Sequence, residues 1–472
     1  MQNNEIKDIK NGGFQINSFY LFSFLEVFSI WENSANTYYK ILKMPFLRIK
    51  KSYNKKEYKL FSILPIFKTK NKTSNPYKPL NNHYSKVLKN LKAKAQSGQK
   101  IRVGFYIVEV FQYASIYEEM LKSDFFEPFI VVVPDVARKE ISISCMNSSY
   151  ELLKRKYENV YKGFDEKTNR YIDFSDKFDV VFFGNPYQTM AHPYHFIWQM
   201  LKRNVLTCYQ NYGYNTVLWG RNHICSLPFY NSCWKVFADS QESFDDLLAY
   251  QPRQAQNAWI SGYCKMDKLA EVKSVEHTRK QILLCPHHTI NFKHLQLSNF
   301  LKYADFFLEL PKKYPEVDFI FRPHQLLRYN LAKYWSEEQA QEYYDKMLSY
   351  PNVKYDTGQD YFQTFVNSDA MIHDCGSFTA EYLFTGKPCC YMLKNEEEIA
   401  QTFLPIGQKC LNNYYKAFNQ EQICSFIENV IVKGEDPLKR QREIFSEYLK
   451  LNYPNVGQKI TEYIKQEILN AK

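Results

Sequence analysis

Three short segments of the chain carry side chains that can bind a phosphate group or move a proton. Histidine can act as an acid or a base near neutral pH, or donate a hydrogen bond to a phosphate oxygen, and arginine can hold a phosphate with two parallel hydrogen bonds. Such residues could also bind a zinc ion, but no two of them stand at the helical i, i+4 spacing together with a third metal ligand. The three segments are Pro286-His287-His288-Thr289, Arg322-Pro323-His324 and His373-Asp374.

The third segment continues into the sequence Gly376-Ser377-Phe378-Thr379, which opens a predicted helix over 379–385. Backbone amides and the hydroxyls of Ser377 and Thr379 would bind an anionic oxygen at the positive end of that helix. Glu381, one turn further on, would accept hydrogen bonds from ribose hydroxyls. The competing interpretation is an ordinary N-cap with an acid in the first turn.

Each of the three segments follows a short apolar run, and the same kind of run recurs along most of the chain. Uninterrupted runs of Val, Ile, Phe and Leu are typical of strands buried on both faces. Helical patterns such as 292–313 and 336–348 separate them, which predicts parallel sheets covered by helices. The expected strands are 101–108, 129–133, 180–183, 205–209, 236–238 and 259–260, then 282–285, 319–321, 353–355, 370–372 and 389–392.

The two series of strands predict two facing Rossmann-like domains, at 96–264 and 265–436, with a ligand in the cleft between them. Ligands of such sheets lie beyond the carboxyl ends of the strands, where the three polar segments stand. We expect an N-terminal extension over 1–95 and an amphipathic C-terminal helix over 437–472. The boundary between the two domains falls near 262–278.

Composition excludes several classes of protein. The chain has 472 residues, of which 45% are hydrophobic and 24% charged, so it is neither disordered nor fibrous. Its 11 cysteines include no C-x-x-C pair, which argues against a disulfide framework. The N-terminus lacks the apolar region of a signal peptide. The aromatic stretch 19–31 is too short to span a membrane and carries Glu26, so we predict a helix there rather than a transmembrane segment.

Basic residues are concentrated in the N-terminal extension. The net charge is +11, and residues 40–72 hold eleven Lys or Arg and a single acid, Glu57. Apolar clusters interleaved with lysine suit an anionic membrane surface, whereas no nucleic-acid-binding motif accompanies the segment. We therefore expect a membrane-surface segment and no nucleic-acid partner. The simpler interpretation is a solvated basic linker.

Over 262–392 the chain resembles the CDP-glycerol glycerophosphotransferase family, the enzymes that prime and polymerise teichoic acids and related capsule polymers. Four motifs match in the order of the family. They are Gly262-Tyr263-Cys264-Lys265-Met266-Asp267, then Pro286-His287-His288-Thr289, Arg322-Pro323-His324, and Asp374-Cys375-Gly376-Ser377-Phe378-Thr379-Ala380-Glu381 followed by Lys387-Pro388.

The resemblance implies an α/β, GT-B-like fold with a basic, partly helical N-terminal extension. It implies transfer of a polyol phosphate, with glycerol phosphate first, from a CDP-activated donor to a hydroxyl of a lipid-linked or polysaccharide acceptor, with release of CMP. Residues 96–264 would then form the acceptor domain and 265–436 the donor domain. Family members act at the cytoplasmic face of the membrane as peripheral proteins. We expect no tightly bound cofactor and no metal ligands.

The resemblance also assigns residues to roles. His324, with His287 and His288, would be catalytic. Asp374 is expected to hold its loop through backbone amides. The residues that would bind the donor and its phosphates are Arg322, Asp374, Gly376, Ser377, Thr379 and Glu381.

The acceptor side departs from the family pattern at one position. Family members have a histidine, taken as the catalytic base, directly before a glycine that matches Gly213. In this chain Tyr212 takes the position of that histidine. A tyrosine with a pKa near 10 is a poor base at neutral pH, so His287 or His288 would have to substitute. Two alternatives follow: a GT-B glycosyltransferase that uses a nucleotide sugar, and an inactive assembly subunit of a polysaccharide complex.

Overall fold

A computed structural model describes residues 14–21, 25–32, 36–41, 44–52, 55–61, 64–70, 77–108, 110–138, 141–223, 225–292, 295, 297–358 and 360–472. Its contacts divide the chain into two compact units. The smaller unit comprises residues 1–83 and 226–232, and the larger unit comprises 84–225 and 233–472.

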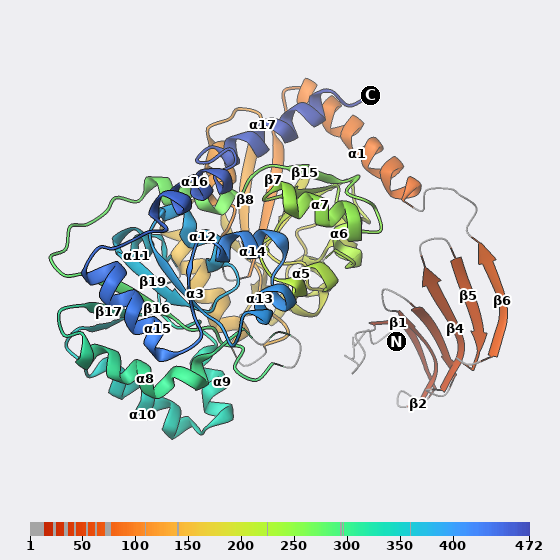
Figure 1. Ribbon diagram of the computed structural model, residues 1–472. Helices are drawn as coiled ribbons and strands as arrows, with labels where there is room; N and C mark the ends of the chain where they lie inside the picture. The colour runs from red at the N-terminus through yellow and green to blue at the C-terminus, as the bar shows by residue number, and fades with distance from the viewer. Residues whose placement is uncertain are drawn as a thin grey trace. The chain divides into compact units, whose positions relative to one another are not determined.

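The first sheet of the larger unit has seven parallel strands in the order β15-β14-β13-β12-β7-β8-β9 (Figure 1). Its central strands are buried on both faces, as their continuous apolar sequences predict. The strands are β7 (Ile101–Ile107), β8 (Phe126–Val132), β9 (Val160–Lys162), β12 (Val180–Phe183), β13 (Leu206–Gln210), β14 (Lys235–Ala238) and β15 (Ala258–Ile260).

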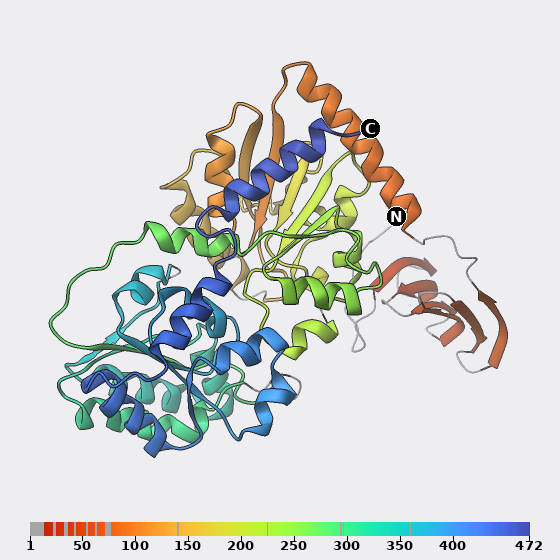
Figure 2. The ribbon, with the colours of Figure 1, turned by 45° about the horizontal axis from the view of Figure 1, so that its top comes forward.

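The second sheet of the larger unit has six parallel strands in the order β18-β17-β16-β19-β20-β21 (Figure 2). The order places the three strands that carry the polar segments side by side. The strands are β16 (Gln281–Cys285), β17 (Asp318–Phe321), β18 (Val353–Tyr355), β19 (Ala370–His373), β20 (Cys389–Met392) and β21 (Tyr415–Ala417). Together the two sheets confirm the predicted α/β fold with two Rossmann-like halves.

Helices connect most of the successive strands in both sheets, as is usual for parallel pairing. Between β9 and β12 the chain instead forms a short antiparallel hairpin of β10 (Phe164–Asp165) and β11 (Arg170–Tyr171). Those of the larger unit after α1 are α2 (Ala114–Leu121), α3 (Ser142–Lys154), α4 (Ile197–Met200), α5 (Leu218–His223), α7 (Gln241–Tyr250), α8 (Phe300–Lys313), α9 (Leu327–Tyr334), α10 (Glu337–Leu348), α11 (Phe362–Asn367), α12 (Phe378–Glu381), α13 (Glu397–Thr402), α14 (Pro405–Leu411), α15 (Gln420–Ser425), α16 (Lys439–Leu449) and α17 (Val456–Leu469). Short 3₁₀ segments cover Cys264–Glu271 and Tyr382–Thr385, and a π-helical turn covers Phe426–Val432.

One predicted helix starts later than its sequence suggests. The pattern over 292–313 predicted a single helix, but α8 begins at Phe300. The amide of Asn299, the residue before α8, donates to the carboxylate of the buried Asp374 at 2.6 Å. This hydrogen bond keeps Asn299 out of the helix.

The smaller unit contains an antiparallel six-stranded sheet in sequential order. The helix predicted over 19–31 is wrong, because residues 19–21 and 25–31 belong to the first two strands, while residues 22–24 lie outside the described residues. Aromatic and β-branched residues dominate it, and these favour strands. The strands are β1 (Phe14–Leu21), β2 (Leu25–Glu32), β3 (Asn36–Ile41), β4 (Met44–Ser52), β5 (Lys55–Leu60) and β6 (Leu64–Lys70), and α6 (Pro228–Ser232) also belongs to this unit.

The extension is nevertheless partly helical, as predicted, because α1 (Lys78–Gln96) follows the sheet. Within the basic segment 40–72, residues 42–43, 53–54, 62–63 and 71–72 lie outside the described residues. All eleven cysteines are unpaired. In the described parts of the chain, no helix has both the length and the apolar character needed to cross a membrane.

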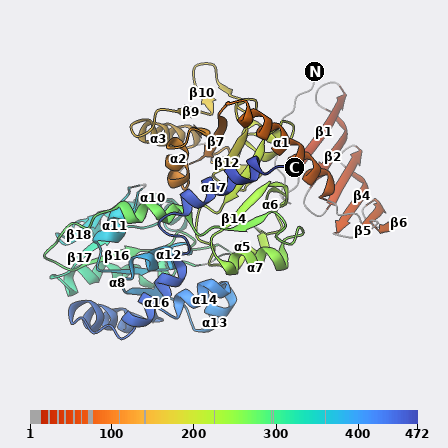
Figure 3. The ribbon, with the colours of Figure 1, turned by 90° about the horizontal axis from the view of Figure 1, so that it is seen from above.

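The C-terminal stretch predicted as one helix contains two, α16 and α17. Helix α16 packs against the Tyr382–Thr385 turn of the second half, while α17 packs against α2 of the first half. In the larger unit, α17 also lies beside α1, where Lys92 Nζ donates to the carbonyl of Ala471 at 2.9 Å (Figure 3). The end of the chain therefore ties the two halves together.

Two residues of the first family-like motif hold this crossing in place. Gly262 has a φ of +86°, and a Cβ there would lie 2.0 Å from the carbonyl oxygen of Leu451, so only glycine fits. The buried Asp267 accepts the amides of Val456 at 3.2 Å and Gly457 at 2.7 Å, at the start of α17. This motif is structural and docks the C-terminal helices.

Candidate active site

The histidines that follow β16 and β17 meet at the carboxyl edge of the second sheet. The ring centroids of His287 and His288 lie 4.5 Å apart, those of His287 and His324 lie 5.1 Å apart, and those of His288 and His324 lie 4.1 Å apart. One nitrogen of each ring lies within 4.8 Å of the others. The structure thus brings together three of the predicted residues from two neighbouring strands.

Hydrogen bonds at Nδ1 fix the tautomers of two of these rings. The backbone amide of Leu326 donates to His324 Nδ1 at 3.2 Å. Asn330 Nδ2 lies 3.1 Å from His288 Nδ1 and 2.9 Å from the carbonyl of His288. Since a carbonyl only accepts, the Asn330 group facing it is the NH₂ donor, and His288 Nδ1 is its acceptor. In the neutral rings the proton therefore lies on Nε2.

His287 is the third ring of the group. Its Nδ1 lies 2.9 Å from Thr289 Oγ1, and that oxygen also accepts the amide of Leu297 at 3.1 Å. Burial and the neighbouring imidazoles lower the pKa of His287 well below its usual value. Burial lowers the pKa of His288 to about 4 and that of His324 to about 3. The three rings are neutral at pH 7.

The arrangement suits an oxyanion better than a metal ion. A ligating imidazole needs a lone pair at the metal and normally donates its other N–H to an acceptor. Here Nδ1 of His288 and of His324 accepts, so Nε2 is a donor. The charge of Arg138, which follows β8 in the first half, also lowers the pKa of both rings. A positive charge nearby opposes a cation and favours a phosphate oxygen.

Arg322 lies beside this group but is held by the protein. Its guanidinium pairs with Asp356 at 2.5 Å and donates to the carbonyl of Gly358 at 2.6 Å. It also lies 5.3 Å from the ring centroid of Tyr361. Burial tends to raise the pKa of Asp356, but the Thr364 hydroxyl and the Arg322 charge lower it overall, so the pair is ionised.

The buried side chain of Asp374 holds two loops of the site in position. It is fully buried, and its carboxylate accepts the amides of His287 and Asn299, both at 2.6 Å. Burial raises its pKa to about 7 despite these hydrogen bonds. The structure places it in the loop-holding position and not at the surface of the cleft.

The loop after β19 divides into an accessible and an inaccessible part. Gly376 and Ser377 are half-buried, and the Ser377 hydroxyl makes no capping bond to the helix that follows. Thr379 is fully buried, and its hydroxyl donates to the carbonyl of Cys375 at 2.7 Å. Ser377 is thus placed to meet a ligand, whereas the Thr379 hydroxyl points into the core.

Glu381 is enclosed by side chains from both halves. It is fully buried, accepts hydrogen bonds from Tyr263 at 3.2 Å and from Tyr361, and lies 3.6 Å from Lys265 Nζ. Lys265 also donates to the carbonyl of Tyr212 at 3.5 Å. In this structure Glu381 is therefore part of the contact between the halves.

The predicted acceptor residues lie directly opposite the Ser377 loop. A Cβ on Gly213 would lie 3.1 Å from Ser377 Cβ, which explains a glycine at this position. Thr216 Oγ1 donates to the carbonyl of Gly376 at 2.7 Å. The adjacent Tyr212 keeps 43% of its surface exposed. The residues predicted on the donor side and those predicted on the acceptor side therefore form one continuous site across the two halves.

Several residues of this site were not predicted from the sequence, and one residue that the sequence suggested, His373, lies outside it. Asn330 and Arg138 carry no motif. Only the fold shows that Asn330 contacts His288 and that the charge of Arg138, which is paired with Asp135 at 2.6 Å, acts on His288 and His324. Lys265 lies within a recognised motif, but its role depends on the contact with Glu381. His373 packs against Tyr391 in the core with a ring centroid distance of 4.8 Å, and burial lowers its pKa to about 3.

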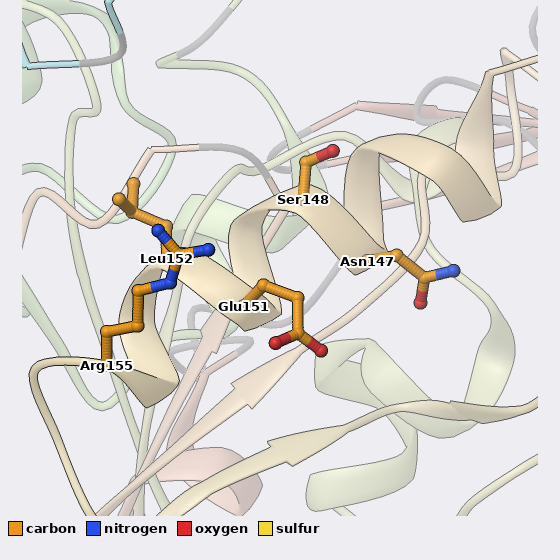
Figure 4. A pocket seen from close by; sticks show the side chains of 5 residues that line it. All are labelled: Asn147, Ser148, Glu151, Leu152 and Arg155. Carbon is orange, nitrogen blue, oxygen red and sulfur yellow. The ribbon is translucent and has the colours of Figure 1, made fainter.

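A shallow depression on the outer face of α3 lies apart from these residues (Figure 4). Side chains from one helix and the residue after it line it, and none of the predicted site residues takes part. The lining residues are Asn147, Ser148, Glu151, Leu152 and Arg155.

Comparisons with known proteins establish the fold. No family model matches the chain, and no curated protein sequence is similar to it.

Among solved structures, the wall teichoic acid polymerase TagF is similar with a TM-score of 0.51 and 12% identity, over 83% of this chain and 98% of that one. The UDP-GlcNAc 2-epimerase of Neisseria meningitidis, bound to UDP-GlcNAc, has a TM-score of 0.50 and 16% identity, over 78% and 100%. MnaA of S. aureus, in a structure with UDP, has a TM-score of 0.51 and 12% identity, over 79% and 98%. The chain is GT-B-like, as predicted.

Proposed function

We propose that this protein transfers a polyol phosphate, most simply glycerol phosphate, from a CDP-activated donor to a hydroxyl of a polysaccharide or lipid-linked acceptor, with release of CMP. The observation that carries the proposal is the group of three neutral imidazoles at the carboxyl edge of the second sheet, of which His288 and His324 present Nε2 as a donor. The four motifs shared with the CDP-glycerol glycerophosphotransferase family and the similarity to TagF support it.

The proposed chemistry requires charge neutralisation more than covalent help. Phosphoryl transfer proceeds through a loose transition state, in which charge spreads over the transferred oxygens. Donors fixed in advance are each worth about 3 kcal/mol at such a site. His287, His288 and His324 would donate to the pyrophosphate, and Ser377 would bind it from the neighbouring loop. Because Nε2 carries the proton in the neutral rings of His288 and His324, we assign these two histidines as donors to the leaving phosphate rather than as bases.

A glycosyltransferase that uses a nucleotide sugar is the second candidate. The similarity to the UDP-GlcNAc 2-epimerase bound to UDP-GlcNAc favours it, because a pyrophosphate held by the same donors would serve either reaction. The two functions differ in the nucleotide released. A polyol phosphate transferase releases CMP, whereas a glycosyltransferase releases a nucleoside diphosphate or, from a CMP-sugar, CMP.

The experiment is a donor panel with the full-length protein. CDP-glycerol, CDP-ribitol and a set of nucleotide sugars are each incubated with an acceptor extract, and the released nucleotides are separated chromatographically. We expect CMP from a CDP-polyol, and a loss of release in the His324→Ala variant. Release of UDP or GDP alone would select the glycosyltransferase. Absence of heat on titration with CDP-glycerol and with CMP would select the inactive assembly subunit.

We place the protein at the cytoplasmic face of the membrane as a peripheral protein. The support for this placement is the charge of residues 40–72, which would attract anionic lipid at roughly 1 kcal/mol for each basic residue near the surface.

A further inference from the structure

Three aromatic side chains gather at the carboxyl edge of the first sheet. Tyr187 follows β12, Tyr212 follows the neighbouring β13, and Trp219 lies in α5. The ring centroids of Tyr187 and Tyr212 are 6.4 Å apart at 69°, and those of Tyr187 and Trp219 are 6.3 Å apart at 53°. These three residues are called the aromatic corner, because their rings form angled walls and not a stack.

The loops that carry the corner are fixed in position. Asn185 Oδ1 accepts the amide of Tyr187 at 3.0 Å, and Gln112 Nε2 donates to the carbonyl of Gly184 at 3.0 Å. On the other side, Lys265 binds the carbonyl of Tyr212. Rigid loops lower the entropy that a ligand must remove on binding, so the corner is organised before any ligand arrives.

The chemistry of the corner is amphipathic. Tyr and Trp offer large, rigid apolar faces with a polar edge, at a small cost in conformational entropy. The hydroxyls of Tyr187 and Tyr212 lie 3.5 Å apart, so two groups that can donate and accept face the same point. A pyranose ring presents C–H groups on its face and hydroxyls around its rim, which match both features. A free polyol chain has no apolar face of comparable size.

We propose that the aromatic corner is the acceptor subsite and that it binds a neutral sugar ring. The inference rests on the proposed function, which requires an acceptor hydroxyl near the donor phosphate. Gly213 connects the corner to that site, because it follows Tyr212 directly and abuts Ser377. The tyrosine that replaces the family histidine would then serve to bind a sugar acceptor in place of the terminal glycerol phosphate of a growing polymer.

The test is a binding measurement that needs no donor. The full-length protein is applied to an array of neutral hexose and N-acetylhexosamine oligosaccharides, with glycerol phosphate oligomers as the anionic arm, and hits are titrated calorimetrically. We expect a neutral oligosaccharide to bind. Tyr212→Ala should weaken it by about tenfold, since it removes both a ring face and a hydroxyl. Tyr212→Phe keeps the face and should weaken it by about threefold.

The control is Tyr334→Ala, which removes a tyrosine that is 52% exposed at the end of α9 and should leave saccharide affinity unchanged. CMP affinity, measured on the same variants, should remain within twofold of wild type. Binding of glycerol phosphate oligomers without any neutral saccharide would overturn the inference, and so would saccharide binding unaffected by Tyr212→Ala. A protein that binds the saccharide but not CMP would instead overturn the proposed donor and leave the subsite standing.

Discussion

At the scale of single residues, the position of one proton decides what each histidine of the site can do. An imidazole whose Nδ1 accepts a hydrogen bond presents an N–H at Nε2, which binds an oxyanion but cannot abstract a proton. His324 is the clearest case, because its partner is a backbone amide and cannot reverse its polarity. Mutants that keep or remove this donor can therefore separate the two roles.

The first prediction concerns His324. Replacement by Ala removes the donor and should lower transfer by about 10²-fold or more, as for the loss of one oxyanion-stabilising group. Replacement by Gln supplies an amide N–H in a similar place and should recover part of the loss. The measurement is CMP release at saturating donor, with the melting temperature as a check on folding.

A matched control for this prediction is His277→Ala. His277 belongs to the same half but bonds Asp369 at 2.9 Å away from the cleft, so transfer should persist. If His324→Gln is as inactive as His324→Ala, the ring acts as a base and the donor assignment is wrong. If His324→Ala retains activity within a few-fold of wild type, His324 is not part of the site.

The second prediction separates Ser377 from Thr379. Ser377→Ala should weaken CMP binding by about 1–2 kcal/mol, the value of a hydrogen bond to a charged group, with little change in stability. Thr379→Val removes a buried hydroxyl bonded to the carbonyl of Cys375, so it should cost about 1 kcal/mol of stability and leave CMP affinity intact. Calorimetric titration with CMP and thermal melting of both variants are the measurements. Unchanged CMP affinity in Ser377→Ala would remove Ser377 from the donor site.

At the scale of the elements, the third prediction concerns the docking of α17. Asp267→Ala leaves the amides of Val456 and Gly457 without their buried acceptor. Each unsatisfied amide costs about 1–3 kcal/mol. We expect a lower free energy of unfolding and faster hydrogen exchange along α17. Asp245→Ala, at an exposed position on α7, is the control and should change stability by less than about 0.5 kcal/mol. Unchanged exchange in α17 would show that its apolar face suffices for docking.

The fourth prediction concerns the N-terminal sheet. A variant that lacks residues 1–76 should keep turnover of a soluble acceptor analogue and lose binding to anionic vesicles. Binding of the full chain should also decrease with salt, because the Debye length shortens to about 8 Å at physiological ionic strength. Vesicle co-sedimentation at several salt concentrations is the measurement. Binding that survives both the truncation and high salt would place the membrane contact on another surface.

Most of the sheet architecture could be predicted from sequence, and the reason is physical. Strands of a parallel sheet covered on both faces need continuous apolar sequences, so eleven strands of the two sheets were visible as runs. The two that were missed, β9 and β21, are three-residue edge strands with few apolar positions. The N-terminal strands were missed because a run dense in aromatic residues satisfies helical and strand periodicity alike.

The site could be predicted only in part. The strand-end rule located His287, His288 and His324 because it depends on topology alone. It could not give side-chain direction, which is why His373, at an equivalent strand end, lies in the core instead. Nor could it show that Glu381 is enclosed, because its partners Tyr263 and Lys265 are distant in sequence.

At the scale of the whole molecule, buried histidines govern the response to acid. Six of them have a pKa lowered mainly by burial: His192, His195, His287, His288, His324 and His373. A group whose pKa is lower in the folded state contributes stability that is present above its unfolded pKa of about 6.5 and is lost as the pH falls toward the folded value. Buried aspartates act in the opposite sense, because burial raises the pKa of Asp239 and Asp267 to about 6 and that of Asp374 to about 7.

The fifth prediction follows from this imbalance. Burial also raises the pKa of Asp246 and Glu398, so six histidines oppose five carboxyls, while carboxyls with a lowered pKa, such as Asp356, act in the same direction as the histidines. The melting temperature should therefore decrease as the pH is lowered from 6.5 to about 4. His373→Asn keeps an acceptor for the amide of Cys375 and removes one titrating ring, so its decrease should be shallower. Thermal melting of both proteins across this range is the measurement. A melting temperature that is constant or rises on acidification would contradict it.

The crossing of the C-terminal chain also sets the timing of folding on the ribosome. Helix α2 ends at Leu121, but α17, which packs against it, begins only at Val456. At a synthesis rate of about 5–20 residues per second, the intervening chain takes roughly 17 to 67 seconds to make. During this interval α2 can pack against β8 and the Cys264–Glu271 segment but not yet against α17. The first half, although synthesised early, therefore completes its core only after the second half has been made.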